Sequence, residues 1–587
     1  MPKYAHYINR FTFGEVSPLV WSRTDLGKYA ASCKRLENFI PLLQGPVQRR
    51  GGTRFRAVSG NGTRPVMLRD FAFSSTTNYI LEFGDKYLRF FHQGQPLKNP
   101  NGSVYQIATP WSQADLYETN GLPRLKIAQS ADVMWIVCMT QPPQRLMRHG
   151  HLDWRISPLP DWAPRPNPHA VTLFRERLCL GALETIYMSQ AGAFENFQLQ
   201  TDAEIQTPDD PIEICVYSQQ MNLIEWLCPA GKLLIGTRGG EFLVGETTSV
   251  DPFGPGNVKV TPETEFGTSP LQALRVGSVV LFVQRSGRKL RQFVYDQLGD
   301  TYAAMDLTAA AEHITNSKSG IVDYVWQSQP LETLWLARSD GRLLGFTYSK
   351  EHEMNAWHQH TLGGDGKVVS MAKVPALQGG RDELWLAVRR EVDGQTVHYI
   401  ETLEPGHEYG EDVTECFFVD SGLTFQGNKL TEISGLAHLE GHTVHILANG
   451  GVQPAQVVKN GRVPLQYPAE KVHVGLPYCS RLTTVDFDAN LPDGTAKARI
   501  KRTVKVHLQL IESAGGSVGD KDDRLVPMEY WTAPRPMGKA PGLYTGLQTV
   551  SWPGGYETDG SVTVIQDLPL PFLLSGIIQE LQIEGLN

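Results

Sequence analysis

Short strand-turn-strand units recur along most of the chain, and long helical periodicity is scarce. Residues 78–83, the turn Gly84-Asp85 and residues 86–91 form the clearest unit, which predicts a β-hairpin. Apolar segments of the same kind are centred on residues 132–137, 177–180, 232–236, 279–283, 333–337 and 383–387. Their spacing of about 45–55 residues is typical of the four-stranded blades of a β-propeller.

A ring of small sheets would bury the apolar residues of these units. Each sheet has an apolar face that it cannot bury alone, and the neighbouring sheet covers that face. We therefore predict a mainly β fold with an irregular β-propeller of about six or seven blades over residues 61–410. A series of stacked β-sandwiches is the alternative interpretation.

The rest of the chain predicts three further units. Residues 1–60 would form an N-terminal platform or arm, residues 411–490 a small β-barrel or sandwich, and residues 491–587 a C-terminal β segment that completes the platform. The last unit follows a junction at Leu491-Pro492-Asp493-Gly494 and contains a strictly alternating stretch at residues 503–510. Helices are expected only at residues 25–39 and 307–314, where apolar residues or alanines favour them.

Composition excludes several classes of protein. The 587 residues exceed a single hydrophobic core, which stops growing at about 250–300 residues. A net charge of −8 disfavours tight binding to a phosphate backbone. No apolar run is long enough for a membrane helix or a signal peptide, so secretory export is not expected. The seven cysteines are widely spread without a CxxC pair, which indicates reduced thiols and assembly in a cytoplasm.

No catalytic motif stands out, and we expect neither an enzyme nor a cofactor or metal. The chain lacks a GxSxG elbow, a Walker A loop, an HExxH helix and a dinucleotide fingerprint. His438, His442 and His445 could form a zinc site, but separate histidines around a turn are the simpler interpretation. The same holds for His358-x-His360, and Asp209-Asp210 is interpreted as part of a rigid turn.

The opening of the chain carries a resemblance to a known family. It contains Phe11-Thr12-Phe13-Gly14-Glu15-Val16-Ser17-Pro18, then Arg23-Thr24-Asp25-Leu26, and later Arg49-Arg50-Gly51-Gly52-Thr53-Arg54-Phe55. This order resembles the opening of the tail nozzle proteins of short-tailed bacteriophages, also called tail tubular protein B. Phe13 and Pro46 stand where glycine is usual in that family. Further matching blocks are residues 79–90, 128–133, 194–197, 236–241, 311–314 and 474–478.

The resemblance implies a structural virion protein at the distal end of a short tail, assembled in the host cytoplasm. Family members form a homo-hexameric ring that docks on the tail adaptor ring and encloses and gates the channel for genome ejection. The implied partners are therefore the adaptor, tail fibres or spikes, the host cell surface, and phage DNA that passes without sequence-specific binding. Six copies would carry a net charge of about −48 (six times −8), which suits a conduit for DNA. The alternatives are a virion-associated polysaccharide depolymerase or cell-wall hydrolase, and a carbohydrate-binding propeller.

Arg49, Arg50, Thr53 and Arg54 are the candidate interface residues. Arginine suits partly buried polar contacts between subunits better than lysine does, because its planar fork donates several hydrogen bonds at once. We therefore predict that the segment from Arg49 to Arg54 contacts a neighbouring subunit or the adaptor. The adjacent Gly51-Gly52 pair is expected to meet a backbone φ requirement of a turn.

Overall fold

The computed structural model describes residues 3–74, 76–199, 207–217, 222–296, 301–315, 318–376, 379–491, 494–497, 499–522, 524–530, 540 and 542–584. The fold is mainly β, as predicted, and the described residues contain a single α-helix, the one-turn α1 (Gln113–Leu116). No helix in these ranges is long and apolar enough to cross a membrane.

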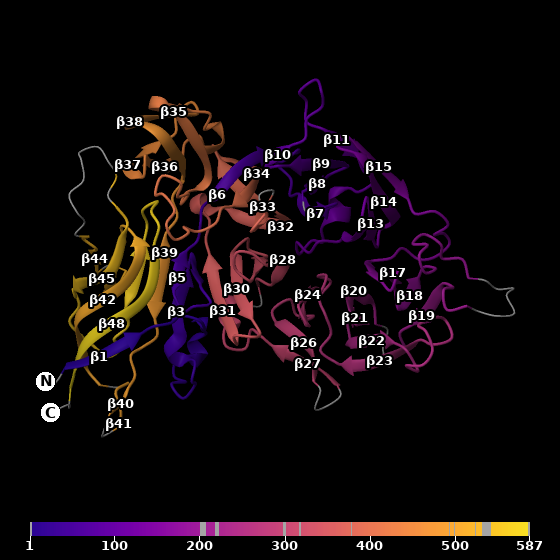
Figure 1. The fold of residues 1–587 in the computed structure, drawn as a ribbon, viewed down its shortest axis with the longest axis horizontal. Helices are drawn as coiled ribbons and strands as arrows, with labels where there is room; N and C mark the ends of the chain where they lie inside the picture. The colour runs from indigo at the N-terminus through magenta and orange to yellow at the C-terminus, as the bar shows by residue number, and fades with distance from the viewer. Residues whose placement is uncertain are drawn as a thin grey trace.

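Seven antiparallel sheets of four or more strands follow one another along the middle of the chain, and Figure 1 shows them in the right-hand part of the molecule. We number them sheets 1 to 7. Sheet 1 holds β7 (Met67–Ala72), β8 (Asn78–Gly84), β9 (Tyr87–His92), β10 (Gln95–Pro96) and β11 (Gln106–Ala108). Sheet 2 holds β12 (Lys126–Ser130), β13 (Val133–Cys138), β14 (Gln141–Gly150) and β15 (Asp153–Pro158). Sheet 3 holds β16 (Ala170–Phe174), β17 (Arg177–Ala182), β18 (Thr185–Met188) and β19 (Ile212–Cys215).

The remaining four sheets repeat the same meander. Sheet 4 holds β20 (Ile224–Ala230), β21 (Lys232–Thr237), β22 (Glu241–Gly245) and β23 (Lys259–Thr264). Sheet 5 holds β24 (Leu274–Val276), β25 (Val279–Val283), β26 (Leu290–Asp296) and β27 (Thr301–Asp306). Sheet 6 holds β28 (Ile321–Gln327), β29 (Thr333–Arg338), β30 (Leu343–Ser349) and β31 (Met354–His360). Sheet 7 holds β32 (Lys367–Pro375), β33 (Asp382–Val392), β34 (Gln395–Leu403) and the early strand β6 (Thr53–Val58).

Each of these sheets packs against the next through its own buried apolar cluster. Strand alternation makes this possible, because successive side chains point to opposite faces. In β13, Met134 and Ile136 face sheet 1, whereas Trp135 and Val137 face sheet 3. An additional cluster places Trp385 of sheet 7 against sheet 1, so the last sheet packs against the first.

Strand β6 precedes sheet 1 in the sequence but forms its main-chain hydrogen bonds with sheet 7. It pairs antiparallel with β34, with Thr53 opposite Leu403 and Val58 opposite Tyr399. A strand that precedes sheet 1 in the sequence therefore completes sheet 7. Backbone pairing therefore fastens the chain that leads into sheet 1 to sheet 7, in addition to the apolar packing between the two sheets.

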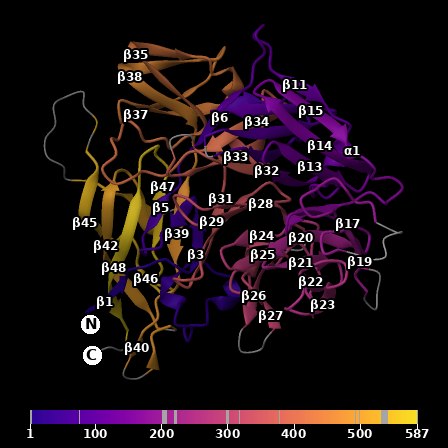
Figure 2. The same ribbon diagram turned by 45° about the vertical axis from the view of Figure 1, so that its right-hand side comes forward.

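The N-terminal and C-terminal segments fold together into a two-layer unit beside the seven sheets (Figure 2). One layer contains β1 (Lys3–Ile8), β4 (Phe39–Pro41), β5 (Val47–Arg49), β42 (Lys501–Ser513), β45 (Tyr544–Ser551), β46 (Tyr556–Glu557) and β48 (Leu573–Ile583). The other contains β2 (Gly14–Glu15), β3 (Ser32–Glu37), β39 (Ser480–Thr484), β43 (Ser517–Lys521), β44 (Arg524–Pro527) and β47 (Thr563–Gln566), and it continues directly into β31 of sheet 6. A common core lies between the layers, and we call this unit the sandwich.

A third unit extends sheet 7 on the far side of β6. It contains β35 (Asp420–Ser434), β36 (Thr443–Ala448), β37 (Gly451–Val457) and β38 (Arg462–Leu476), and we call it the small unit. Its core is a separate apolar cluster. Because β6 pairs with both β34 and β35, the small unit and sheet 7 share one continuous sheet.

Both helix predictions are wrong. Residues 25–39 contain a short 3-10 turn (Tyr29–Ala31) followed by β3, whose Cys33 and Leu36 enter the sandwich core. Pairing of β3 with β39 outweighs the helical spacing of its apolar residues, since local propensity is a weak term beside tertiary pairing. Residues 307–314 form only a 3-10 turn at Glu312–Ile314. Pro492 and Asp493 of the predicted junction lie outside the described residues.

The Gly51-Gly52 pair is required by close approach of three backbone segments and not by a positive φ. A Cβ on Gly52 would lie 2.0 Å from the carbonyl oxygen of Val419, and one on Gly51 would lie 2.2 Å from that of Glu404. Gly52 also donates its N–H to Phe417 and accepts from the N–H of Glu404. The pair therefore lets the chain pass between the end of sheet 7 and the start of the small unit.

We predict that Gly52→Ala lowers the free energy of unfolding by about 1–3 kcal/mol, because overpacking at a rigid backbone contact cannot relax cheaply. Urea unfolding followed by tryptophan fluorescence measures the loss. Gly27→Ala is the matched control, since a Cβ there would meet nothing within 4 Å. Equal stability of the two variants would contradict the close-approach explanation.

Candidate functional site: a buried arginine junction

The four candidate interface residues lie on the segment that passes from the sandwich to sheet 7. Arg49 ends β5, Arg50 follows it, and Thr53 and Arg54 begin β6. The side chains of Arg49, Arg50 and Thr53 are fully buried within the chain, and only Arg54 is partly exposed. Their role in an interface with a neighbouring subunit or the adaptor stays a prediction.

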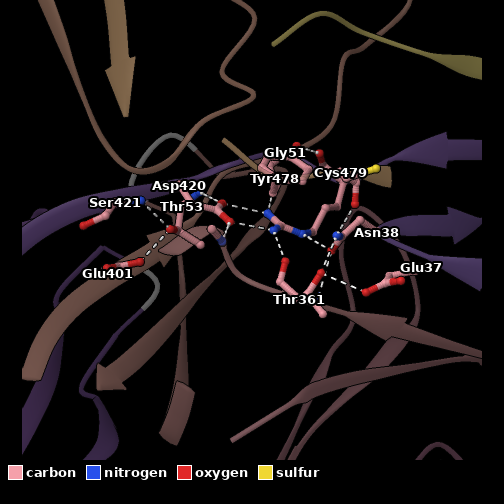
Figure 3. A network of polar contacts seen from close by, with 12 residues as sticks. Glu37, Asn38, Gly51, Thr53, Thr361, Glu401, Asp420, Ser421, Tyr478 and Cys479 are labelled. Atoms are coloured by element: carbon pink, nitrogen blue, oxygen red, sulfur yellow. Dashed lines mark hydrogen bonds and ion pairs between the residues drawn. The ribbon is translucent and has the colours of Figure 1, made fainter. Parts of the chain in front are cut away.

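Arg50 donates hydrogen bonds to four residues, Asn38, Gly51, Thr361 and Asp420, all of which Figure 3 labels. Its Nε donates to Asn38 Oδ1 at 2.8 Å, and its Nη atoms donate to both carboxylate oxygens of Asp420 at 2.9 and 2.7 Å. The other two N–H groups reach the carbonyl oxygens of Gly51 at 2.8 Å and Thr361 at 2.9 Å. All five donors of the guanidinium therefore have an acceptor, which a buried arginine needs.

Asp420 is satisfied equally well on the other side of the ion pair. Besides the two bonds from Arg50, its oxygens accept the backbone N–H of Thr53 at 3.0 Å and that of Gly363 at 2.8 Å. Burial alone would raise the pKa of Asp420, but the Arg50 charge and these hydrogen bonds outweigh it and lower that pKa below its usual value. The pair is thus ionised at neutral pH.

A tyrosine ring covers the guanidinium. The Cζ of Arg50 lies 3.8 Å from the ring centroid of Tyr478, whose hydroxyl donates to the carbonyl oxygen of Arg50 at 2.5 Å. The guanidinium of Arg49 lies 4.5 Å from the same centroid, and Arg49 donates to the carbonyl oxygens of Tyr478, Leu568 and Leu570. The two neighbouring arginines therefore tie the connection between β38 and β39 to the segment that precedes β48.

Asn38 was not anticipated from the sequence. It is fully buried at φ 55°, and its Nδ2 donates to Thr361 Oγ1 at 3.0 Å and to the carbonyl oxygen of Cys479 at 2.6 Å (Figure 3). Asparagine tolerates this left-handed conformation better than most residues. An asparagine between two apolar strand residues, Leu36 and Phe39 being buried on either side, is the only local signal that could have pointed to it.

A second buried ion pair extends the junction through Thr53. The Thr53 hydroxyl donates to Glu401 Oε2 at 2.6 Å and accepts the N–H of Ser421 at 2.8 Å (Figure 3). Glu401 in turn receives two hydrogen bonds from Arg390, at 2.6 and 2.9 Å. The network thus runs from the sandwich across the end of sheet 6 and sheet 7 into the small unit, and its chemistry is that of a structural joint.

The histidines considered for a metal site are not brought together. His438 stacks on Phe55 and donates to the carbonyl oxygen of Ser421, whereas His442 bonds the carbonyl oxygen of Glu391. His358 and His360 bond each other at 2.6 Å inside sheet 6, and burial lowers the pKa of His358 to about 3, which keeps it neutral. The described residues contain no group of three potential metal ligands. Asp210 accepts the N–H of Thr207, as the turn interpretation predicts.

A cysteine, a histidine and a glutamate lie in line where the segment that follows sheet 7 meets the sandwich. Cys416 Sγ is 3.3 Å from His407 Nδ1, and His407 Nε2 is 2.9 Å from Glu512 Oε2 in the sandwich. Burial and several nearby carboxylates raise the pKa of the Cys416 thiol far above neutrality, so it is not a thiolate nucleophile. The group instead links the sheet 7 end of the chain to the sandwich.

The fold and the junction define a multi-unit β protein whose buried charges hold units together. A comparison with models of known protein families matches residues 168–407 to the family described as bacteriophage nozzle protein. This range contains sheets 3 to 6 and strands β32–β34 of sheet 7. The match confirms the resemblance to the tail nozzle family, whose matching blocks lie both inside and outside this range. The match identifies a structural protein of a bacteriophage tail and hence a component of the virion. No curated protein matches the chain.

We predict that Asp420→Asn destabilises the protein by about 3–5 kcal/mol, because it leaves the Arg50 charge buried without a counterion. Differential scanning calorimetry and urea unfolding measure the loss. Glu432→Gln is the control, since its pair with Arg462 is exposed and such pairs contribute little. An Asp420→Asn protein as stable as this control would show that the junction does not hold the units together. Replacing Arg49 and Arg50 together (Arg49→Glu, Arg50→Glu) should likewise leave buried charges without counterions. We therefore expect this double variant to fail at folding and not first at assembly.

The His407 group predicts a pH dependence. Burial lowers the pKa of His407, but hydrogen bonds and charge from Glu411 and Glu512 outweigh it, and the net pKa is raised above 6.5. A raised folded-state pKa means that the stabilisation is complete below the unfolded pKa of about 6.5 and is lost as pH rises through the folded value. The free energy of unfolding, measured from pH 5 to 9, should therefore decrease above pH 6.5 in the unsubstituted protein. This decrease should be absent from the His407→Gln variant. The exposed His352→Gln should leave the profile unchanged, and an identical profile in all three proteins would contradict the assignment.

Proposed function

We propose that the protein is the tail nozzle of a short-tailed bacteriophage. In this proposal six copies form a ring at the distal end of the tail, which docks on the tail adaptor and encloses and gates the channel for genome ejection. The single observation that carries the proposal is the match of residues 168–407 to the bacteriophage nozzle protein family. Assembly would take place in the host cytoplasm, in keeping with seven cysteines that are all free.

We further propose that sheets 1 to 7 form a seven-bladed β-propeller. The packing of each sheet on the next, and of sheet 7 on sheet 1, supports a closed ring. The completion of sheet 7 by β6 supports it as well, because a strand from one end of the series then secures the other. Radial closure also leaves only short and protected sheet edges.

The sandwich is the part that we assign to the platform between subunits and toward the adaptor. Pairing of β1 with β48 and of β5 with β48 places residues from both ends of the chain in one layer, which supports a shared platform. An interface at Arg49, Arg50, Thr53 and Arg54 remains a prediction. The burial of the first three favours a supporting role, in which they fix the sandwich relative to the sheets while Arg54 lies nearer the surface.

The remaining partners follow from the same proposal. Phage DNA would pass through the lumen without sequence-specific binding, and a net charge of −8 per copy supports low adhesion between the wall and the phosphates. Tail fibres or spikes would bind the outside of the ring, and the host cell surface would meet its distal end.

Electron-microscope class averages test the proposal. The protein is produced together with the products of neighbouring genes, and we expect six-fold rings stacked on a wider ring. A second sample without those products distinguishes self-assembly from templated assembly. Co-produced protein that remains monomeric and binds none of those products would contradict the nozzle function.

A further inference from the structure

A hollow of about 770 Å³ lies between sheets 2 and 3, away from the arginine junction. Two sequence blocks that are about 60 residues apart meet there. Ser130 ends β12, Ala131 lies in the turn that follows it, and residues 193–198 come from the connection between β18 and β19. The volume lies within the range of about 300–1,000 Å³ that small-molecule sites occupy.

The walls of the hollow are held in place by contacts behind them. Arg145 of β14 donates to Glu195 Oε2 at 2.5 Å, which fastens the 193–198 loop to sheet 2. Arg165 donates to the backbone carbonyl oxygens of Asp161 at 3.1 Å and Phe197 at 2.6 Å, so one guanidinium fixes both rims. Asn196 closes the loop by bonding Gln190 and the N–H of Gln198. The hollow is therefore formed before any ligand arrives.

Its lining combines aromatic carbon with polar groups that are not in use. The ring centroid of the half-buried Phe194 lies 5.4 Å from that of Trp135, and both residues line the hollow. The Asp161 carboxylate and the side chains of Ser130 and Gln198 have no hydrogen-bond or ion-pair partner within the described ranges. Together they offer the two acceptor oxygens of one carboxylate, an amide and a hydroxyl around one apolar surface.

The charge of the lining selects among ligands. No lysine or arginine lines the hollow, and its acidic residues are Asp161 and the already paired Glu195. A phosphate or another anion would meet an uncompensated carboxylate, and a wholly apolar ligand would cover polar groups without satisfying them. A ligand with many hydroxyl groups and apolar C–H faces satisfies both features of the lining.

We propose that this hollow binds a neutral oligosaccharide. In the complex, Phe194 packs against a C–H face of one sugar ring, Asp161 accepts hydrogen bonds from two neighbouring hydroxyls, and Gln198 and Ser130 bond the next ring. The site binds its ligand without cleaving it, because Glu195 is engaged by Arg145 and leaves Asp161 as the one unengaged carboxyl group of the lining, whereas glycoside hydrolysis uses a pair. This function is additional to the nozzle function and independent of it.

Saturation-transfer NMR and calorimetry on the full chain test the proposal. The probes are neutral trisaccharides of glucose, galactose, mannose and N-acetylglucosamine, with a sialylated trisaccharide as the charged comparison. We expect at least one neutral sugar to bind with a Kd below about 1 mM and the sialylated sugar at least about tenfold more weakly. Failure of every neutral sugar to bind, or tighter binding of the sialylated one, would overturn the proposal.

Variants locate the site. Phe194→Ala and Asp161→Asn should each weaken binding by about tenfold or more, whereas Asp393→Asn should not change it. Asp393 is the matched control because it is also an exposed aspartate at positive φ, 50° against 52° for Asp161. Unchanged binding in both hollow variants would overturn the assignment, as would release of new reducing ends from the bound sugar. Repeating the titration on assembled rings separates the two functions, since rings that form without binding sugar would reject only this site.

Discussion

A guanidinium that is removed from water must find five acceptors and a counterion, and Arg50 finds all of them in segments that are remote in sequence. Its carboxylate partner, Asp420, is 370 residues away, and its other acceptors lie in the sandwich and at the end of sheet 6. Ionic pairs of this kind are costly to bury and even more costly to leave incomplete. The junction is therefore satisfied only when the sandwich, the sheets and the small unit are all in their places.

The strand pairing gives the same units a second, continuous connection. The layer of the sandwich that contains β2 and β3 continues into sheet 6 through the pairing of β2 with β31. The small unit continues into sheet 7 through the pairing of β35 with β6. Arg50 lies on the short segment between β5 and β6, where the chain leaves the sandwich and enters sheet 7. Hydrogen-bonded sheets thus run on both sides of the buried pair, and a relative movement of the units would break backbone pairing and the pair together.

Periodic features of the sequence predict much of this architecture. They do not predict the individual contacts between residues that are far apart in the sequence. The recurring apolar segments, such as those around Trp335 and Trp385, correctly locate middle strands, because each must cover a neighbour on both faces. Alternation at residues 503–510 likewise predicts β42. The helix predicted at residues 25–39 fails because its apolar spacing is also compatible with a strand once β39 is available as a partner. The sequence marks Arg49 and Arg50 as unusual, but it contains no local sign of Asp420 and only a weak one of Asn38, since their roles depend on which segments the fold brings together.

The burial of these arginines changes how a segment with strong resemblance to a family should be interpreted. A block of charged residues and glycines in a loop suggests a surface that binds a partner, and Arg54 still fits that description. Arg49, Arg50 and the two glycines instead meet internal constraints: complete hydrogen bonding of two buried cations and passage of one backbone between two others. Such constraints restrict the residue types at least as strongly as an interface does. In the ring proposed above, this internal rigidity would keep the channel at a fixed width as DNA passes, because the buried junction fixes the sandwich relative to the sheets within each subunit.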